Sequence, residues 1–282
     1  MAISFNHPNS TRHFLVSHTT FLLPFLISEL NMPLETLSFL LSLGSIYVNK
    51  KRVFENRALV AKDYVRVHVF PKRFPVLDID WKSLIHFQNE NFLVINKPPG
   101  IPVHETLDNY EENITRQLSH YLKTTLLVTQ RLDVPVSGLF ILAKTKSFQS
   151  FFNRLLASHQ ITKHYHALTA FCPPAGLHTH FMEKSLSAPK ILSETFSENH
   201  LRCELEILST TASGPHYLST IHLLTGRTHQ IRAQLSALEC PILGDTLYGG
   251  TSDLFSIKKI ALHSTCLSFR EFNFSLPPPW PH

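Results

Sequence analysis

The segment from Thr129 to Thr145, TQRLDVPVSGLFILAKT, holds a single carboxylate among residues that can fix its position. Asp133 follows Arg131 by two positions, and the Asp-Val-Pro that it opens is typical of a turn. The apolar run GLFILA comes next and predicts a strand that is buried on both faces. A carboxylate in such a turn is either a structural cap or a reactive group, able to act as a nucleophile or to move a proton.

Other segments of the chain would have to bring partners to this carboxylate. FLVINKP predicts a strand that ends at Lys97, and SFQSFFNRLLASH predicts an amphipathic helix with Phe and Leu on one face. KHYHALTAF and RCELEIL alternate and predict strands. RTHQIRAQLSAL, after a turn at Thr225-Gly226, predicts a helix. From about residue 85 the pattern is therefore mixed α+β.

The chain before residue 85 predicts a separate small module. Residues 1–20 are polar and are expected to be frayed, and residues 75–85 read as a linker to a larger domain at 86–282. Within 21–74, two helices are expected, the second between Pro33 and Gly44. Two short strands around Asn49-Lys50 and the alternating YVRVHV complete the module.

Composition limits the classes of function. Of the 282 residues, 43% are hydrophobic and 17% are charged, which indicates a globular chain, and the net charge of +5 suits an anionic partner. The four cysteines form no C-x-x-C and predict free thiols in a reducing cytoplasm. The closely spaced histidine pairs have no carboxylate or cysteine cluster beside them, so no metal site is expected.

No apolar run reaches the roughly 18 residues that a membrane span needs. The longest candidate, Phe21–Leu30, is short and is interrupted by Pro24. Residues 1–28 contain no acid, as in targeting segments, but they lack an A-x-A cleavage pattern. We therefore expect a cytoplasmic protein that does not enter the membrane.

Six stretches, in this order, resemble the motifs of the RluA-type RNA pseudouridine synthases. They are FLVINKPPGIPVH (92–104), RLDVPVSGLFILAKT (131–145), KHYHAL (163–168), LLTGRTHQIRAQL (223–235), PILGDTLYGG (241–250) and ALHSTCLSF (261–269). Residues 40–69 resemble, more loosely, an S4-like RNA-binding domain. The resemblance implies an α+β pseudouridine synthase fold with a mixed, mostly antiparallel central sheet and an active-site cleft, preceded by a small α/β S4-like domain.

The activity implied by the resemblance is isomerisation of uridine to pseudouridine in structured ribosomal or transfer RNA. Uracil is detached from its ribose and rejoined through carbon five, after the nucleotide is flipped out of its stack. The resemblance implies that Asp133 is the nucleophile and that Arg232 is its partner, which would oppose the effect of burial on the Asp133 pKa. No cofactor is expected, and a monomer is the default.

Further roles follow from the resemblance, each beside a plainer alternative. Arg131 is expected to fill the gap left by the flipped base or to grip the backbone, unless it is an ordinary surface arginine. Tyr165 is expected to stack on the base and to serve in proton transfer, unless it only packs in the core. Arg227 and His229 are expected to hold a phosphate near a helix N-terminus, although His229 could equally be a buried, hydrogen-bonded histidine.

In the N-terminal module, Lys50, Lys51 and Arg52 are expected to contact the RNA backbone, with a solvated charged face as the alternative. The sequence also departs from the family pattern. Gln130 stands where a histidine is usual, and Val136 stands where a threonine is frequent. Neither change removes a catalytic group, so activity is still expected.

Two other functions are alternatives to this one. A catalytically silent RNA-binding or ribosome-assembly factor on the same fold would not depend on Asp133. A deaminase acting on a flipped base would need zinc ligands of the H-x-E…P-C-x-x-C type, which the sequence lacks.

Overall fold

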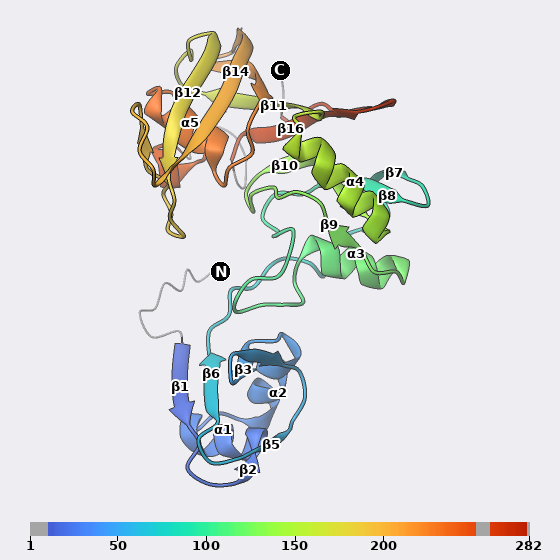
Figure 1. The fold of residues 1–282 in the computed structure, drawn as a ribbon, viewed down its shortest axis with the longest axis vertical. Coiled ribbons are helices and arrows are strands. Elements are labelled where there is room, and N and C mark those ends of the chain that lie inside the picture. The colour runs from blue at the N-terminus through green and yellow to red at the C-terminus, as the bar shows by residue number, and fades with distance from the viewer. Residues whose placement is uncertain (1–10, 252–259, 281–282) are drawn as a thin grey trace. The chain divides into compact units, whose positions relative to one another are not determined.

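The computed structural model describes residues 11–251 and 260–280 (Figure 1). The described residues fall into two compact units. Unit 1 comprises the chain up to residue 79 together with residues 104–123, and unit 2 comprises the rest.

Unit 1 contains a four-stranded sheet in the order β1-β6-β3-β4, a two-stranded ladder of β2 and β5, and three helices. Its elements are β1 (Thr11–Leu15), β2 (Thr20–Phe21), α1 (Leu22–Leu30), α2 (Leu34–Ser42), β3 (Ile46–Val48), β4 (Lys51–Val53), β5 (Ala58–Leu59), β6 (Tyr64–His68) and α3 (Ile114–Leu122).

The two expected helices and the expected hairpin of the module are confirmed. One apolar face of α1 and one of α2 pack with the inward residues of β6 in a common core. Asn49 and Lys50 both have positive φ, 50° and 67°, as a tight hairpin between β3 and β4 requires. The expectation of a frayed N-terminus is wrong for Thr11–Leu15, because β1 pairs along β6 and Phe14 packs on the core. Residues 1–10 lie outside the described residues.

Residues 104–123 belong to unit 1, whereas the sequence suggested a continuous domain from 86 to 282. The segment is fastened by buried polar contacts. Glu112 accepts hydrogen bonds from Arg73 Nε at 2.9 Å, from the Phe74 N–H at 2.8 Å and from Asn109 Nδ2 at 2.8 Å. Arg52 also donates to the carbonyl of Thr106. Hydrogen bonds between residues that are far apart in the sequence leave no periodic pattern from which they could be predicted.

Burial by itself raises the pKa of Glu112, but the hydrogen bonds from Arg73, Phe74 and Asn109 outweigh it and hold the pKa below its ordinary value. The carboxylate is therefore ionised in the folded chain at neutral pH, where it stabilises unit 1.

Unit 2 is built on an 11-stranded sheet whose path runs β13-β12-β14-β15-β11-β16-β10-β8-β7, with β17 on β16 and β9 on β10. Its elements are β7 (Ile85–Gln88), β8 (Phe92–Lys97), β9 (Leu127–Val128), β10 (Ser137–Ala143), α4 (Lys146–Ala157), β11 (Thr162–Thr169), β12 (Gly176–Glu183), β13 (Leu192–Ser193), β14 (His200–Ser213), β15 (His216–Leu223), α5 (Gln230–Ala237), the 3-10 helix η1 (Thr246–Tyr248), β16 (Leu262–Phe269) and β17 (Phe272–Ser275).

The sheet is mixed and mostly antiparallel, as the sequence predicted. Among the paired strands described, β10 and β16 run parallel and the others antiparallel. Every residue of β10 is buried, which confirms the expectation from its apolar run. Gly138 lets β10 approach β16, because a Cβ there would lie 2.3 Å from the Ser264 carbonyl oxygen.

Two helices cover parts of this sheet. α4 packs Phe148, Phe152 and Leu155 into a phenylalanine-rich core that includes Phe92 and Phe269. On another part of the sheet, the buried Gln234 of α5 donates to the carbonyls of His178 on β12 and Cys203 on β14. The polar bonds of α5 fix its position on the sheet more narrowly than apolar packing alone would.

The four cysteines are free thiols, as expected. In the described part of the chain, no helix has the length and apolar character needed to cross a membrane.

Replacing Glu112 with Gln is expected to destabilise unit 1 by about 2 kcal/mol at pH 7, because it removes the charge that three donors hold. Since the pKa of Glu112 is lowered on folding, this stability is present above the ordinary pKa of 4.5 and is lost as the pH falls below it. Urea unfolding at pH 7 and pH 4 measures both effects. Glu111→Gln, which breaks the more exposed pair with Arg116, is the control and should cost less than about 1 kcal/mol. Equal losses in the two variants would contradict the assignment.

Candidate active site

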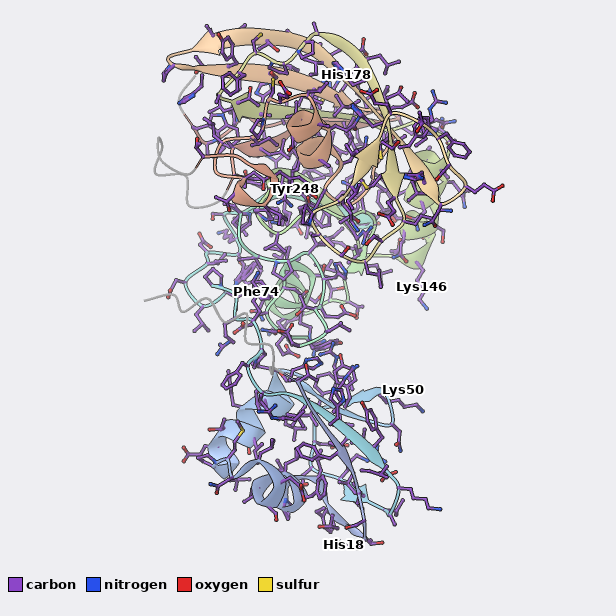
Figure 2. All side chains as sticks on the ribbon, turned by 90° about the vertical axis from the view of Figure 1, so that its left-hand side faces the viewer. His18, Lys50, Phe74, Lys146, His178 and Tyr248 are labelled. Carbon is purple, nitrogen blue, oxygen red and sulfur yellow. The ribbon has the colours of Figure 1, made fainter. Side chains whose placement is uncertain are left out.

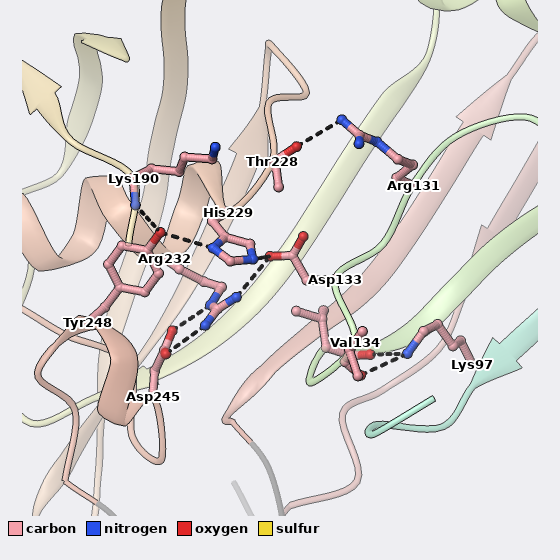
Figure 3. Close-up of polar contacts among 11 residues, drawn as sticks. Lys97, Arg131, Asp133, Val134, Lys190, Thr228, His229, Arg232, Asp245 and Tyr248 are labelled. Carbon is pink, nitrogen blue, oxygen red and sulfur yellow. Dashed lines mark hydrogen bonds and ion pairs between the residues drawn. The ribbon is translucent and has the colours of Figure 1, made fainter. Parts of the chain in front are cut away.

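Asp133 opens a turn at the start of a buried strand. The Val136 N–H donates to the Asp133 carbonyl at 3.1 Å, and β10 begins at the next residue. Lys97, at the end of β8, is fully buried under this turn, and its Nζ donates to the carbonyls of Val134 at 3.2 Å and Val136 at 2.9 Å (Figure 3). The Gly100 N–H also donates to Val134 at 2.7 Å. Lys97 and Gly100 thus fix the position of the backbone that carries Asp133.

The Asp133 side chain is held by Arg232 of α5. The guanidinium of Arg232 donates through Nη1 to Asp133 Oδ2 at 3.3 Å, and through Nε and Nη2 to Asp245 at 2.6 and 2.9 Å (Figure 3). The side chains of Arg232 and Asp245 are 5% and 2% exposed, whereas that of Asp133 is 19% exposed. Asp133 is therefore the member of this trio that a ligand can reach.

The charges of this trio determine the state of the arginine. Burial lowers the pKa of Arg232, but the hydrogen bond and charge of Asp245, followed by those of Asp133, raise it above its ordinary value. Two carboxylates and one guanidinium leave the trio with one net negative charge. A buried ion pair is not by itself evidence of a more stable fold. Removing one member, however, leaves the charge of the other buried and uncompensated.

Asp245 is positioned by a compact loop. Its carbonyl accepts the N–H groups of Tyr248 at 3.0 Å and Gly250 at 2.9 Å. Gly250 is required by this close approach, because a Cβ there would lie 1.9 Å from the Ile242 carbonyl oxygen. The loop therefore presents the Asp245 carboxylate to Arg232 in a fixed direction.

His229 lies on the other side of Asp133. Its backbone is left-handed, with φ 59°, directly before the first residue of α5. Nδ1 lies 3.0 Å from the Tyr248 hydroxyl, and Nε2 lies 3.9 Å from Asp133 Oδ2 (Figure 3). The hydroxyl oxygen accepts the Lys190 N–H at 2.8 Å and can donate its own proton to Nδ1. In that tautomer the neutral ring carries its proton on Nε2, facing Asp133.

The protonation of His229 agrees with this arrangement. Burial is the largest effect and lowers its pKa, while Asp133 raises it and Arg232 lowers it again, and the net pKa is below the ordinary 6.5. The imidazole is therefore neutral at pH 7. His229 is half-buried and hydrogen-bonded to Tyr248, and it also faces the carboxylate, while its expected contact with a phosphate stays a prediction.

Tyr165 of β11 is buried beside the same carboxylate. Tyr165 is 7% exposed and packs with Val136 and Leu168 in the core of unit 2. Burial raises the pKa of Tyr165 well above its ordinary value, the Asp133 charge adds to this, and a hydrogen bond with Ser264 opposes it. The phenol is thus protonated at neutral pH, where it can donate a hydrogen bond but cannot act as a base.

The two expected RNA-contacting arginines near the site are exposed. Arg131 Nη2 donates to Thr228 Oγ1 at 2.8 Å (Figure 3). The Arg227 N–H, by contrast, donates to Gln230 Oε1 at 3.0 Å, so this backbone donor is not offered to a phosphate as the sequence suggested. The Arg227 side chain is still available to a ligand.

In unit 1, Lys50 and Lys51 are exposed at the tip of the hairpin, where Figure 2 shows the Lys50 side chain at the periphery. Arg52 differs from them. Its guanidinium donates to the carbonyls of Gly44 and Thr106 and lies 4.9 Å from the centre of the Tyr47 ring. Arg52 therefore serves the packing of unit 1.

Three residues of the site were given no role from the sequence, namely Asp245, Tyr248 and Lys190. The first two stand in the motif PILGDTLYGG, where an acid and an aromatic between glycines were a signal that could have been followed. Lys190 carried no such signal, because it contributes its backbone N–H. In the described part of the chain, no group of three or more His, Cys, Asp or Glu residues could hold a metal ion.

Replacing Asp245 with Asn is expected to destabilise the protein far more than replacing Asp133 with Asn. The first change deprives the buried guanidinium of its bidentate partner and should cost about 3–5 kcal/mol. The second leaves Arg232 neutralised by Asp245 and removes one bond at a more exposed carboxylate, for about 1 kcal/mol or less. Urea unfolding of both variants measures the loss in the free energy of unfolding. Similar losses in the two variants would show that Arg232 depends equally on the two acids.

His229→Gln is expected to flatten the dependence of stability on pH. Because the pKa of His229 is lowered on folding, the unfolded chain binds a proton that the folded chain does not, so stability falls as the pH drops below about 6.5. Between pH 7.5 and 5.5 the wild type should lose up to about 1 kcal/mol more than the variant. Unfolding at both pH values tests this, with His178→Gln as the control. A wild type and a variant with parallel profiles would refute a neutral His229.

A family model described as RNA pseudouridylate synthase matches residues 91–237. The chain is 37% identical over 217 residues to the rice (Oryza sativa subsp. japonica) RNA pseudouridine synthase 6, chloroplastic, covering 68% of this chain and 46% of that protein. It is 30% identical over 268 residues to the ribosomal large subunit pseudouridine synthase C of Buchnera aphidicola, covering 84% of this chain and 81% of that protein.

The chain thus spans about half the length of its plant relatives and most of the bacterial one. Among solved structures, human RNA Pseudouridylate Synthase Domain Containing 4 matches with a TM-score of 0.57 at 24% identity, over 71% of this chain and 91% of that chain. This likeness shows the fold. The family model and the bacterial relative show that the chain belongs to the RNA pseudouridine synthase family.

Proposed function

We propose that this protein isomerises uridine to pseudouridine in structured RNA, with Asp133 as the nucleophile. The observation that carries the proposal is the partly exposed carboxylate of Asp133, held by Arg232 while Asp245 neutralises that arginine. Family membership sets the reaction class, and the placement of Asp133 supplies the reactive group.

The proposed reaction needs two displacements at the ribose. An Asp133 carboxylate oxygen bonds to C1′ as the C1′–N1 bond breaks, and the electron pair of that bond stays on uracil. After the base turns, its C5 attacks C1′, and the carboxylate leaves with its bonding pair. The proton at C5 is then lost to solvent and N1 gains a proton, which completes the product. Arg232 stabilises the carboxylate before the first step and after the second.

The other site residues have supporting roles in this proposal. Tyr165, held protonated by its raised pKa, is suited to contact the flipped base and to donate a hydrogen bond during proton movement. Arg131 is exposed two residues before Asp133 and suits contact with the RNA next to the flipped nucleotide.

The RNA itself is proposed on two grounds. Bacterial relatives are named ribosomal large subunit pseudouridine synthases, which favours ribosomal RNA over transfer RNA. Unit 1 presents Lys50 and Lys51 at an exposed hairpin, which supports an S4-like RNA-binding role for this module. We propose that the enzyme acts as a monomer.

The compartment is part of the same proposal. Free thiols suit a reducing compartment such as the cytoplasm. The two plant relatives carry the word chloroplastic in their names, and fractionation of cells that express a tagged chain decides between cytoplasm and organelle.

Release of tritium from RNA labelled at uridine C5 tests the activity, because carbon five loses its hydrogen in the product. Wild-type protein should release tritium to water from ribosomal RNA. Asp133→Ala should reduce the rate by about 10⁴-fold or more, since it removes the nucleophile. Asp78→Ala, which removes an exposed acid before β7, should leave the rate unchanged.

Two outcomes would count against the proposal. Absence of release from ribosomal RNA, transfer RNA and intact ribosomal subunits, with RNA binding retained, would favour a silent RNA-binding factor. Full activity of Asp133→Ala would remove Asp133 from the chemistry.

A further inference from the structure

A pocket of about 420 Å³ opens beside the candidate site in unit 2. It is lined by the end of β12 and the segment that follows, by the turn before α5, and by Arg131. Its charged residues are four cations and one acid, namely Arg131, Lys184, Lys190, Arg227 and Glu183. The lining therefore carries an excess of three positive charges, in contrast to the net negative trio around Arg232.

The cationic groups of this pocket are held in place by neutral acceptors. Lys184 Nζ donates to the Glu198 carbonyl at 3.3 Å, and Lys190 Nζ donates to the Ser185 carbonyl. Arg227 Nε donates to the Arg202 carbonyl at 3.5 Å. Each of these contacts uses one donor of an ammonium with three or a guanidinium with five, and it does not neutralise the charge. The groups are thus oriented while keeping charge for an anion.

Residues that line the pocket also contact residues of the site or adjoin them in the chain. The Lys190 N–H donates to the Tyr248 hydroxyl, which lies against His229. Arg131 donates to Thr228, the residue before His229 (Figure 3). A strand of RNA that places one nucleotide at Asp133 would therefore bring its neighbouring backbone to these cations.

We propose that this pocket binds backbone phosphates of the RNA strand adjoining the target uridine. The proposal rests on the proposed function and names a second contact for the same substrate. Lys184 and Lys190 supply compact charges from one segment, and Arg131 and Arg227 supply planar donors that match phosphate oxygens from the facing turns. These contacts are to phosphates and not to bases, so the pocket contributes affinity and fixes the register of the strand. Other residues must select the target uridine.

The salt dependence of RNA binding tests the proposal. Each phosphate neutralised adds about 0.7–0.9 to the slope of log affinity against log salt concentration. Lys184→Gln and Lys190→Gln should each lower the slope by about that amount, so that raising KCl from 50 to 200 mM weakens the variant about threefold less than the wild type. In the tritium assay the loss should fall mainly on KM. Lys146→Gln, which removes the same charge from the first turn of α4, is the matched control and should keep the wild-type slope.

Two results would overturn the proposal. One is a Lys146→Gln slope as low as that of the pocket variants, because net charge alone would then explain the effect. Another is an unchanged slope in both pocket variants. Competition of inorganic phosphate with RNA at constant ionic strength that disappears in Lys190→Gln would instead support the proposal, because both ligands would then occupy the pocket.

The test separates this inference from the proposed function. Asp133→Ala should bind RNA with the wild-type slope and release no tritium. If the wild type releases no tritium while the pocket variants still lose slope, the activity fails and the phosphate pocket stands. If the wild type releases tritium and the pocket variants match it in slope and KM, the pocket fails alone.

Discussion

The bridge from one buried guanidinium to two carboxylates is the interaction on which unit 2 depends. Arg232 cannot lie where it does without Asp245, because an uncompensated charge at that depth would be strongly destabilising. While Nε and Nη2 of this guanidinium donate to Asp245, its third nitrogen, Nη1, donates to Asp133. The contact between Arg232 and Asp245 therefore fixes the position of α5 relative to the loop that carries Asp245, and the apolar side chains pack around this pair.

A second constraint acts on the backbone rather than on the side chain. Lys97 holds the turn after Asp133 by its carbonyls, while Arg232 holds the carboxylate itself. Backbone position and side-chain direction are thus fixed by different elements, β8 and α5. Preorganisation of this kind allows a reactive group to meet a substrate without rearrangement during the reaction. The neutral His229 completes the surroundings of Asp133 without adding a positive charge that would compete with Arg232.

Much of this arrangement could be predicted from the sequence, where local patterns are strong. The apolar run of β10 and the stops around α2 depend on burial and backbone preference, which a few neighbouring residues determine. The pairing of Asp133 with Arg232 came from motif resemblance, and the structure brings the two side chains together. The role of Lys190 could not be predicted, because it contributes its backbone N–H, whereas Asp245 and Tyr248 stand in a motif whose acid and aromatic residue carried a signal. Arg52 was assigned to RNA on its charge, which stays a prediction, and its contacts with Tyr47 and the carbonyl of Thr106 could not be read from that charge.

The assignment of residues 104–123 to unit 1 has a consequence for the way in which this protein can be taken apart or can change over evolution. Unit 1 is made from two separate stretches of chain, so no single cut releases it whole. A shortened chain that starts after residue 79 would retain α3 and the loop before it without Arg73, the arginine that Glu112 pairs with. The N-terminal module therefore cannot be removed as one continuous segment. Its loss or exchange during evolution would require a matching change in the segment between β8 and β9.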